Sequence, residues 1–69
     1  MNELRRRITG QLEHGPRGLV VVTGAGDHWV IENQDIELEL IGRQVVAEGA
    51  VVGLDRLKVD WLGEERDEA

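Results

Sequence analysis

The chain has 69 residues, a net charge of −6, 41% hydrophobic and 32% charged residues, and no cysteine. A chain this short holds one hydrophobic core, so we expect a single domain over residues 1–69. The composition excludes disulfides and thiolate chemistry and is compatible with the cytoplasm, where we expect the protein. The longest apolar run, residues 19–22, is far below the ~20 residues of a membrane helix, so we expect no membrane partner.

The first predicted strand lies in RRRITGQLEHG, where Ile8, Gly10 and Leu12 alternate with polar residues. Alternation with a period of two is typical of a strand that buries one face. The following HGPRG favours a turn, because proline fixes φ and glycine accepts positive φ. Next comes LVVVT, which is β-branched and apolar on both faces and therefore predicts a central strand.

The glycine-rich GAGD at residues 24–27 resembles both a phosphate-binding loop and a hairpin turn. A dinucleotide loop needs G-x-G-x-x-G followed by a helix. Here Trp29 stands at the third glycine position, and the strand-like HWVIEN follows instead of a helix. We therefore predict a hairpin that joins the second and third strands.

The segment Gln34–Ile41 fits either a strand or a helix. Its apolar side chains alternate with acids, as in a strand, yet Ile36, Leu40 and Ile41 also share one helical face. Acids suit the first turn of a helix, and Gly42 stands where a glycine commonly ends one. We predict one short helix of at most two turns.

Two further strands are predicted in RQVVAEGAVVG and LDRLKVDWL. Gly49 interrupts the first of them, where a glycine commonly marks a bulge or a sharp bend. In the second, Leu57, Val59 and Trp61 point to one side, and the charged residues between them point to the other.

These elements predict a mainly β fold, a small five-stranded OB-fold-like barrel with one short helix between strands 3 and 4. Closure suits a small domain because it removes most exposed sheet edges. The terminal segments 1–6 and 63–69 are expected to be flexible, since the acidic tail has no apolar anchor.

Three stretches carry a family resemblance: ITGQLEHGPRGLVV, GAGDHWVI and LIGRQVVAEGAVVGLDRLKVDWL. They resemble a family of small bacterial OB-like domains of unknown function over about residues 8–62. The spacing of glycines and apolar residues carries the likeness. Ala47 stands where such sequences often have a second valine, and the helical segment is more acidic than the family pattern. The resemblance implies an OB-like fold and implies no activity.

Catalytic groups are scarce, because the chain has neither cysteine nor serine and its only hydroxyls, Thr9 and Thr23, fall on predicted strands. No arrangement singles out two of the 14 acids as a catalytic pair. We therefore expect no enzymatic activity and no cofactor. Four residues are candidate metal ligands but lack the spacing of a metal-binding pair, so no metal is expected: His14, Asp27, His28 and Asp35.

Single-stranded nucleic-acid binding is one candidate function, since OB folds bind bases on aromatic side chains above a basic groove. The candidate binding surface comprises three cations and two aromatic residues: Arg43, Arg56, Lys58, Trp29 and Trp61. The N-terminal arginines 5–7 add a basic arm. Strand parity places both tryptophans among apolar neighbours, and the negative net charge disfavours nucleic acid. We keep this function as the alternative.

Protein binding is the favoured function, because the second and fourth strands are apolar on both faces. The residues on one face lie opposite apolar residues on the other: Val20 and Val22 opposite Leu19 and Val21, and Val46, Ala50 and Val52 opposite Val45 and Val51. The interior of a small closed sheet takes only one of these faces. The other is covered locally, by Leu4, the helix and long polar side chains, or by another chain. We predict a non-catalytic binding module whose partner is a protein or a second copy.

Overall fold

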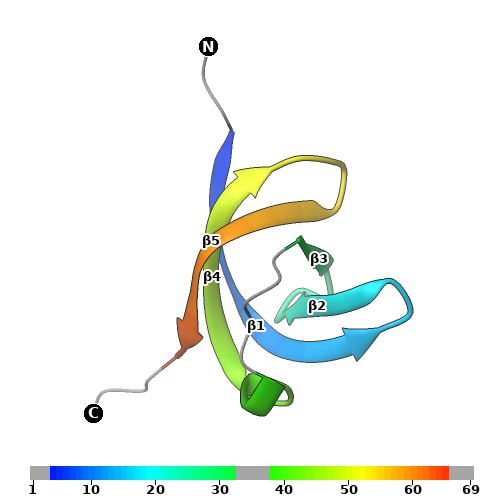
Figure 1. Cartoon of the computed structure of the whole chain (residues 1–69), viewed down its shortest axis with the longest axis vertical. Helices are drawn as coiled ribbons and strands as arrows, with labels where there is room; N and C mark the ends of the chain where they lie inside the picture. Colours follow the sequence, from blue (N-terminus) through cyan, green and yellow to red (C-terminus); the bar gives the residue numbers. More distant parts are fainter. Residues whose placement is uncertain (1–3, 33–37, 66–69) are drawn as a thin grey trace.

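The computed structural model describes residues 4–32 and 38–65. The fold is mainly β, as the sequence predicts (Figure 1). The described residues form five strands: β1 (Arg5–Gly15), β2 (Gly18–Thr23), β3 (His28–Glu32), β4 (Gln44–Val51) and β5 (Arg56–Glu64). Strands reach into both terminal segments expected to be flexible, because β1 begins at Arg5 and β5 continues to Glu64.

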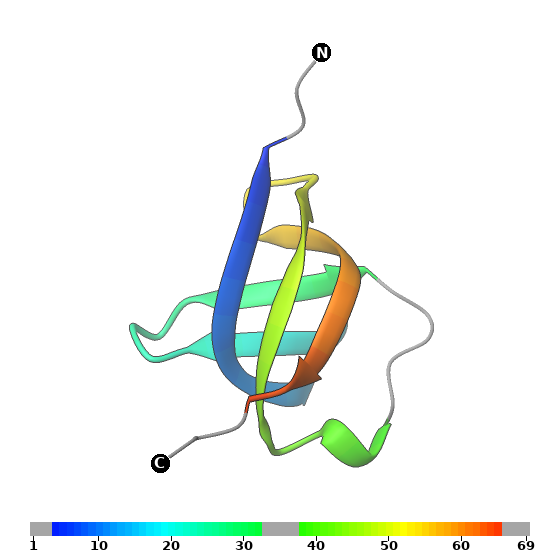
Figure 2. The same cartoon turned by 90° about the vertical axis from the view of Figure 1, so that its left-hand side faces the viewer.

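The five strands form one closed sheet in the order β1-β2-β3-β5-β4, with β4 pairing back to β1. All pairs are antiparallel except β3 with β5, which run parallel. The long β1 belongs to both halves of the sheet, since Gly10 pairs with Thr23 of β2 and with Val45 of β4. Figure 2 shows β1, β4 and β5 side by side, with β2 and β3 crossing behind them.

Two glycines permit the close approach of strands where the sheet curves. A Cβ atom added to Gly10 would lie 2.7 Å from the carbonyl carbon of Val22. One added to Gly49 would lie 2.8 Å from the carbonyl carbon of Lys58. Both separations are shorter than real Cβ contacts, so any side chain at either position forces the backbones apart.

A β-bulge next to Gly49 changes the direction of one tryptophan. Glu48 of β4 pairs with Trp61, and the following residue pairs with Val59, so Asp60 is an extra residue in β5. Because side chains alternate between faces, the insertion turns Trp61 to the outer face. The expectation that Trp61 shares the face of Leu57 and Val59 is wrong, and its side chain is 53% exposed.

The GAGD segment is a hairpin turn between β2 and β3, which confirms the interpretation drawn from its context. Gly26 donates its N–H to the carbonyl of Thr23 at 2.9 Å, and Thr23 donates to the carbonyl of Asp27 at 2.9 Å. Gly26 has a φ of 91°, a conformation that glycine adopts without strain.

The predicted helix between strands 3 and 4 is wrong for the part of this segment that the structure describes. It forms a lone 3₁₀ turn, η1 (Leu38–Leu40), and residues 33–37 lie outside the described residues. The chain after η1 runs back onto β1, where Gly42 donates to the carbonyl of Leu12 at 2.6 Å. A two-turn helix is marginal on its own, and this backbone pairing ends the helical geometry after one turn.

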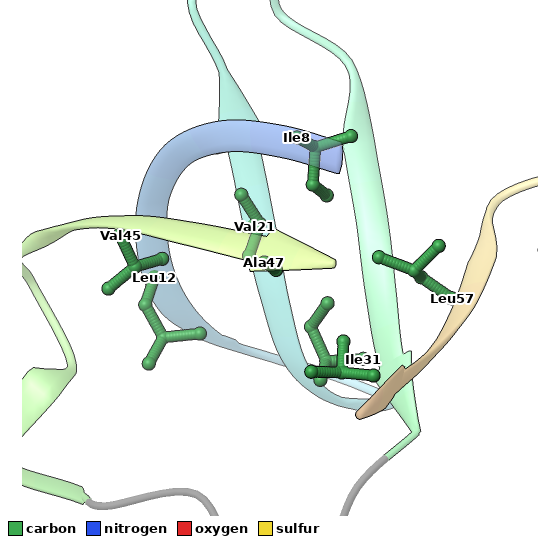
Figure 3. Close-up of a cluster of buried hydrophobic side chains, with 8 residues drawn as sticks. Ile8, Leu12, Val21, Ile31, Val45, Ala47 and Leu57 are labelled. Carbon is green, nitrogen blue, oxygen red and sulfur yellow. The ribbon is translucent and has the colours of Figure 1, made fainter. Parts of the chain in front are cut away.

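The interior of the closed sheet is filled by apolar side chains that point toward one another (Figure 3). Leu12, Val21, Val45 and Leu57 have no exposed surface. Among the described residues, none of the buried side chains is polar or charged. The predicted inward set of β1 is confirmed, with Leu12 in the core beside Ile8.

The outer-face residues that make β2 and β4 apolar on both sides are covered only in part, because Val22 is half-buried and Val52, just after β4, is 49% exposed. Val20, Val46 and Ala50 are only 8%, 8% and 9% exposed, although they lie outside the core cluster. Other parts of the same chain therefore cover these three residues. Of the predicted outer-face residues, Val52 is the most exposed.

Candidate binding surface

The five residues of the predicted binding surface are not gathered at one place. Arg43 is paired with Glu64 at 3.0 Å, and Arg56 is paired with Glu32 at 2.9 Å. Exposed ion pairs of this kind add only about 0–1 kcal/mol to stability, but they neutralise both arginines locally. These two cations therefore offer less positive field to an anion than the sequence implies.

Lys58 and Trp61 lie together on the outer face of β5. They pair with Ala50 and Glu48, which are two residues apart on β4 and so share a face. The tryptophan ring lies over Gly63, where an added Cβ atom would be 3.0 Å from its Cζ2 atom. Lys58 is exposed and forms no ion pair with any described residue.

Trp29 occupies a different environment at the start of β3. It is half-buried, packs against the core and pairs with Val21. The guanidinium carbon of Arg6 lies 5.5 Å from the centroid of its ring, a cation–π contact. Arg6 is two residues before Ile8, so it continues the inward-facing row of β1.

The Arg6–Trp29 contact lies in a surface hollow of ≈ 380 Å³, which we name the Trp29 hollow. It collects residues from β1, the β2–β3 turn, β3 and the β4–β5 loop: Arg6, Asp27, His28, Trp29, Leu54 and Asp55. A smaller hollow of ≈ 170 Å³, lined in part by Pro16, Val20 and Val30, lies beside it and shares His28.

The loops around the Trp29 hollow are fixed by hydrogen bonds. Val30 donates its backbone N–H to the carbonyl of Asp55 at 2.7 Å, which ties the β4–β5 loop to β3. The Asp55 carboxylate accepts a bond from Arg17 of the β1–β2 turn at 2.9 Å. Asp27 donates its N–H to the Thr23 hydroxyl at 3.2 Å. These bonds connect the β4–β5 loop to β3 and to the β1–β2 turn, and they close the β2–β3 turn.

Two charges in the Trp29 hollow have no oppositely charged partner within residues 4–32 and 38–65. The Asp55 carboxylate is neutralised by Arg17, but neither Arg6 nor Asp27 forms an ion pair within the described residues. As far as the described residues are concerned, the guanidinium N–H groups of Arg6 can donate and the Asp27 carboxylate can accept.

One exposed apolar side chain lines this hollow, and two more lie next to the start of β1 and the end of β4. Leu54, at the tip of the β4–β5 loop, is fully exposed at 101%. Val52 and Leu4 are 49% and 67% exposed. The backbone N–H of Val51 donates to the carbonyl of Leu4 at 2.8 Å, so Leu4 lies beside the end of β4. Figures 1 and 2 place the start of β1 and the β4–β5 loop at the same end of the molecule.

The candidate metal ligands are not assembled in the described part of the chain. No group of three histidine, aspartate or glutamate residues lies close enough there to hold an ion. His28 Nδ1 lies 3.1 Å from the carbonyl of Gly26, and Asp35 falls outside the described residues.

Sequence reasoning missed three residues of the hollow, Arg6, Leu54 and Asp55. Arg6 belongs to the predicted basic arm, although the alternation of Ile8, Gly10 and Leu12 extends back to it and predicts the side to which it points. Leu54 carried no periodic signal, because a single leucine in a tight turn has no regular neighbours. Only the position of its loop beside Trp29 gives it a role.

The fold and this surface define a small, mainly β domain with a surface hollow. The chain belongs to the family described as protein of unknown function (DUF5818), which matches residues 9–65. No protein with a curated description and no solved structure matches the chain. Within the described residues, no helix is long and apolar enough to cross a membrane.

Proposed function

We propose that this chain is a non-catalytic OB-like binding module of the bacterial cytoplasm that recognises a protein partner at the Trp29 hollow. The OB-like assignment is supported by five strands in the order β1-β2-β3-β5-β4 with β1 shared by both halves. OB folds are small Greek-key barrels that bind ligands on strands 2 and 3 and on adjoining loops. The hollow includes residues of β3 and of the β2–β3 and β4–β5 connections.

The full exposure of Leu54 at the rim of a hollow that contains Trp29 carries this proposal. Protein interfaces combine an aromatic or aliphatic centre with a rim of polar and charged groups. Trp29 and Leu54 supply the apolar part here, and Arg6 and Asp27 supply charges that are not used within the described chain.

A binding role without catalysis or cofactor is supported by the scarcity of nucleophilic side chains. The chain has no serine or cysteine. Of its two threonines, Thr23 uses its hydroxyl to accept the Asp27 N–H in the β2–β3 turn, and Thr9 is exposed on β1. A nucleophile needs an adjacent base that takes its proton, and neither threonine has one among the contacts described.

A photo-crosslinking amino acid at position 54 tests the proposal in extracts of cells that make the protein. We expect adducts at position 54 and none at position 38. Leu38 is a matched control because it is 70% exposed and lies in η1, at the other end of the molecule (Figure 1). Equal labelling from both positions, or none from either, would contradict a partner at the Trp29 hollow.

Weak binding of single-stranded nucleic acid is the second candidate, and the 53% exposure of Trp61 beside Lys58 favours it. Bases stack on exposed aromatic rings, and a nearby cation attracts the phosphates. An oligothymidylate titrated at low salt is expected to quench the fluorescence of a Trp29→Phe protein, in which Trp61 alone emits. Unchanged emission up to millimolar nucleotide would rule this candidate out.

A further inference from the structure

We propose that the partner of the Trp29 hollow is a second copy of this chain, bound across a two-fold axis. This inference rests on the proposed function, because it names the occupant of the same surface. A two-fold interface uses one patch on both subunits, so each feature of the patch must meet its complement on the other copy. The Trp29 hollow and its rim meet this requirement in shape and in charge.

The shape complement is a projecting side chain next to a recess. Leu54 is fully exposed at a loop tip and also lines the hollow, whose volume is ≈ 380 Å³. Across a two-fold axis, Leu54 of each copy enters the other copy's hollow and contacts Trp29. In each copy the β4–β5 loop, which carries Leu54, is bonded to β3 by the Val30–Asp55 hydrogen bond and to the β1–β2 turn by the Arg17–Asp55 hydrogen bond. These bonds lower the entropy cost of ordering the loop on binding.

The charge complement is one cation and one carboxylate in the same hollow, neither of them in an ion pair with a residue that the structure describes. Arg6 and Asp27 lack ion-pair partners among the described residues, although both line the hollow. In a two-fold dimer, Arg6 of each copy meets Asp27 of the other, which produces two equivalent ion pairs. The remaining acid, Asp55, is already neutralised by Arg17 at 2.9 Å and adds no net repulsion at this point.

The net charge of −6 per chain opposes association at long range. At physiological salt the Debye length is about 8 Å, so charges elsewhere on the two copies are largely screened while contacts inside the interface persist. The oligomeric state is therefore measured by sedimentation equilibrium at about 0.15 M salt, from micromolar to millimolar protein. We expect a monomer–dimer equilibrium.

Leu54→Asp is expected to weaken the dimer by at least tenfold without affecting the fold, because Leu54 is fully exposed in the single chain. Leu38→Asp, at 70% exposure, is the matched control and should leave dimerisation unchanged. A dimer that survives Leu54→Asp, or a chain that remains monomeric at millimolar concentration, would overturn the inference.

Charge reversal tests the reciprocal ion pair. Arg6→Glu and Asp27→Arg are each expected to weaken dimerisation about tenfold, because like charges then face each other. The double variant restores opposite charges and should return to within threefold of the wild type. Lys58→Glu, which changes net charge as Arg6→Glu does but lies outside the hollow, should have no effect. A double variant as weak as the single ones would refute the Arg6–Asp27 contact.

The crosslinking experiment separates this inference from the proposed function. An adduct at twice the 7.7 kDa mass of the chain identifies a second copy at position 54. Adducts of other masses from position 54 alone, with a monomer in sedimentation, retain a protein-binding module and overturn self-association. Absence of position-specific adducts, with a monomer in sedimentation, overturns both.

Discussion

The two tryptophans lie on neighbouring strands of one small closed sheet, but one ring packs against the core and the other is exposed on the outer face. Trp29 packs against the core, with the Arg6 guanidinium 5.5 Å from its ring centroid. Trp61 lies on the outer face of β5 and is 53% exposed. The direction of Trp61 depends on a single extra residue, Asp60. In so small a fold, one inserted residue decides whether an aromatic ring supports the core or remains accessible.

Gly49→Val should lower the stability of the fold more than any other substitution considered, because it adds a side chain next to the β-bulge. Its Cβ atom would overlap the backbone of Lys58, and overpacking of this kind costs about 1–3 kcal/mol or more. A domain of this size has about 3–5 kcal/mol in total. We expect Gly49→Val to unfold at a much lower urea concentration than the wild type at 25 °C, as followed by its β-sheet circular dichroism.

Gly24→Ala is the control for this substitution. Nothing lies within 4 Å of an added Cβ atom at this position, so its stability should stay within about 0.5 kcal/mol of the wild type. A Gly49→Val protein that unfolds at the same urea concentration as Gly24→Ala would show that β4 and β5 do not approach closely at the bulge.

Alanine at each tryptophan measures the difference between them directly. Trp29→Ala is expected to cost about 2 kcal/mol, less than the ~3–5 kcal/mol of a fully buried ring, because Trp29 is half-buried. Trp61→Ala is expected to cost less than about 1 kcal/mol. Urea denaturation provides both values, and equal costs would mean that Trp61 supports the core as much as Trp29 does.

Much of the strand pattern follows from the sequence because period-two alternation and turn residues act locally. The alternation of Ile8, Gly10 and Leu12 correctly predicts the inward face of β1. The residues that follow GAGD correctly predict a hairpin turn rather than a phosphate loop. Gly49 correctly marked an irregularity, since the register shift lies between it and Glu48. In each case, neighbouring residues contain the information that selects the local geometry.

The parts that failed depend on contacts between distant segments. No sequence neighbour of Asp60 indicates that consecutive residues of β4 pair with Trp61 and Val59 and leave Asp60 without a partner in the register. The alternation of side chains along the sequence therefore predicts the wrong face for Trp61. The helical prediction between the third and fourth strands similarly ignored the pairing of Gly42 with Leu12 of β1. The Trp29 hollow is assembled from separated strands and loops, and therefore only part of it was foreseen.

Gly63→Ala gives the smallest and most selective test, because it changes the surroundings of Trp61 alone. The new Cβ atom would lie 3.0 Å from Cζ2 of the ring, close enough to displace a side chain that is free to move outward. Stability should change by less than about 0.5 kcal/mol, since replacing glycine also lowers the entropy of the unfolded chain.

The emission of Trp61 should nevertheless change. In a Trp29→Phe background, Gly63→Ala is expected to increase acrylamide quenching of Trp61, because the displaced ring loses its contact with the strand. In a Trp61→Phe background, the same substitution should leave the quenching of Trp29 unaltered. A change in Trp29 instead would mean that the outer face of β5 and the Trp29 hollow are mechanically linked, and that the two tryptophans do not report on independent regions.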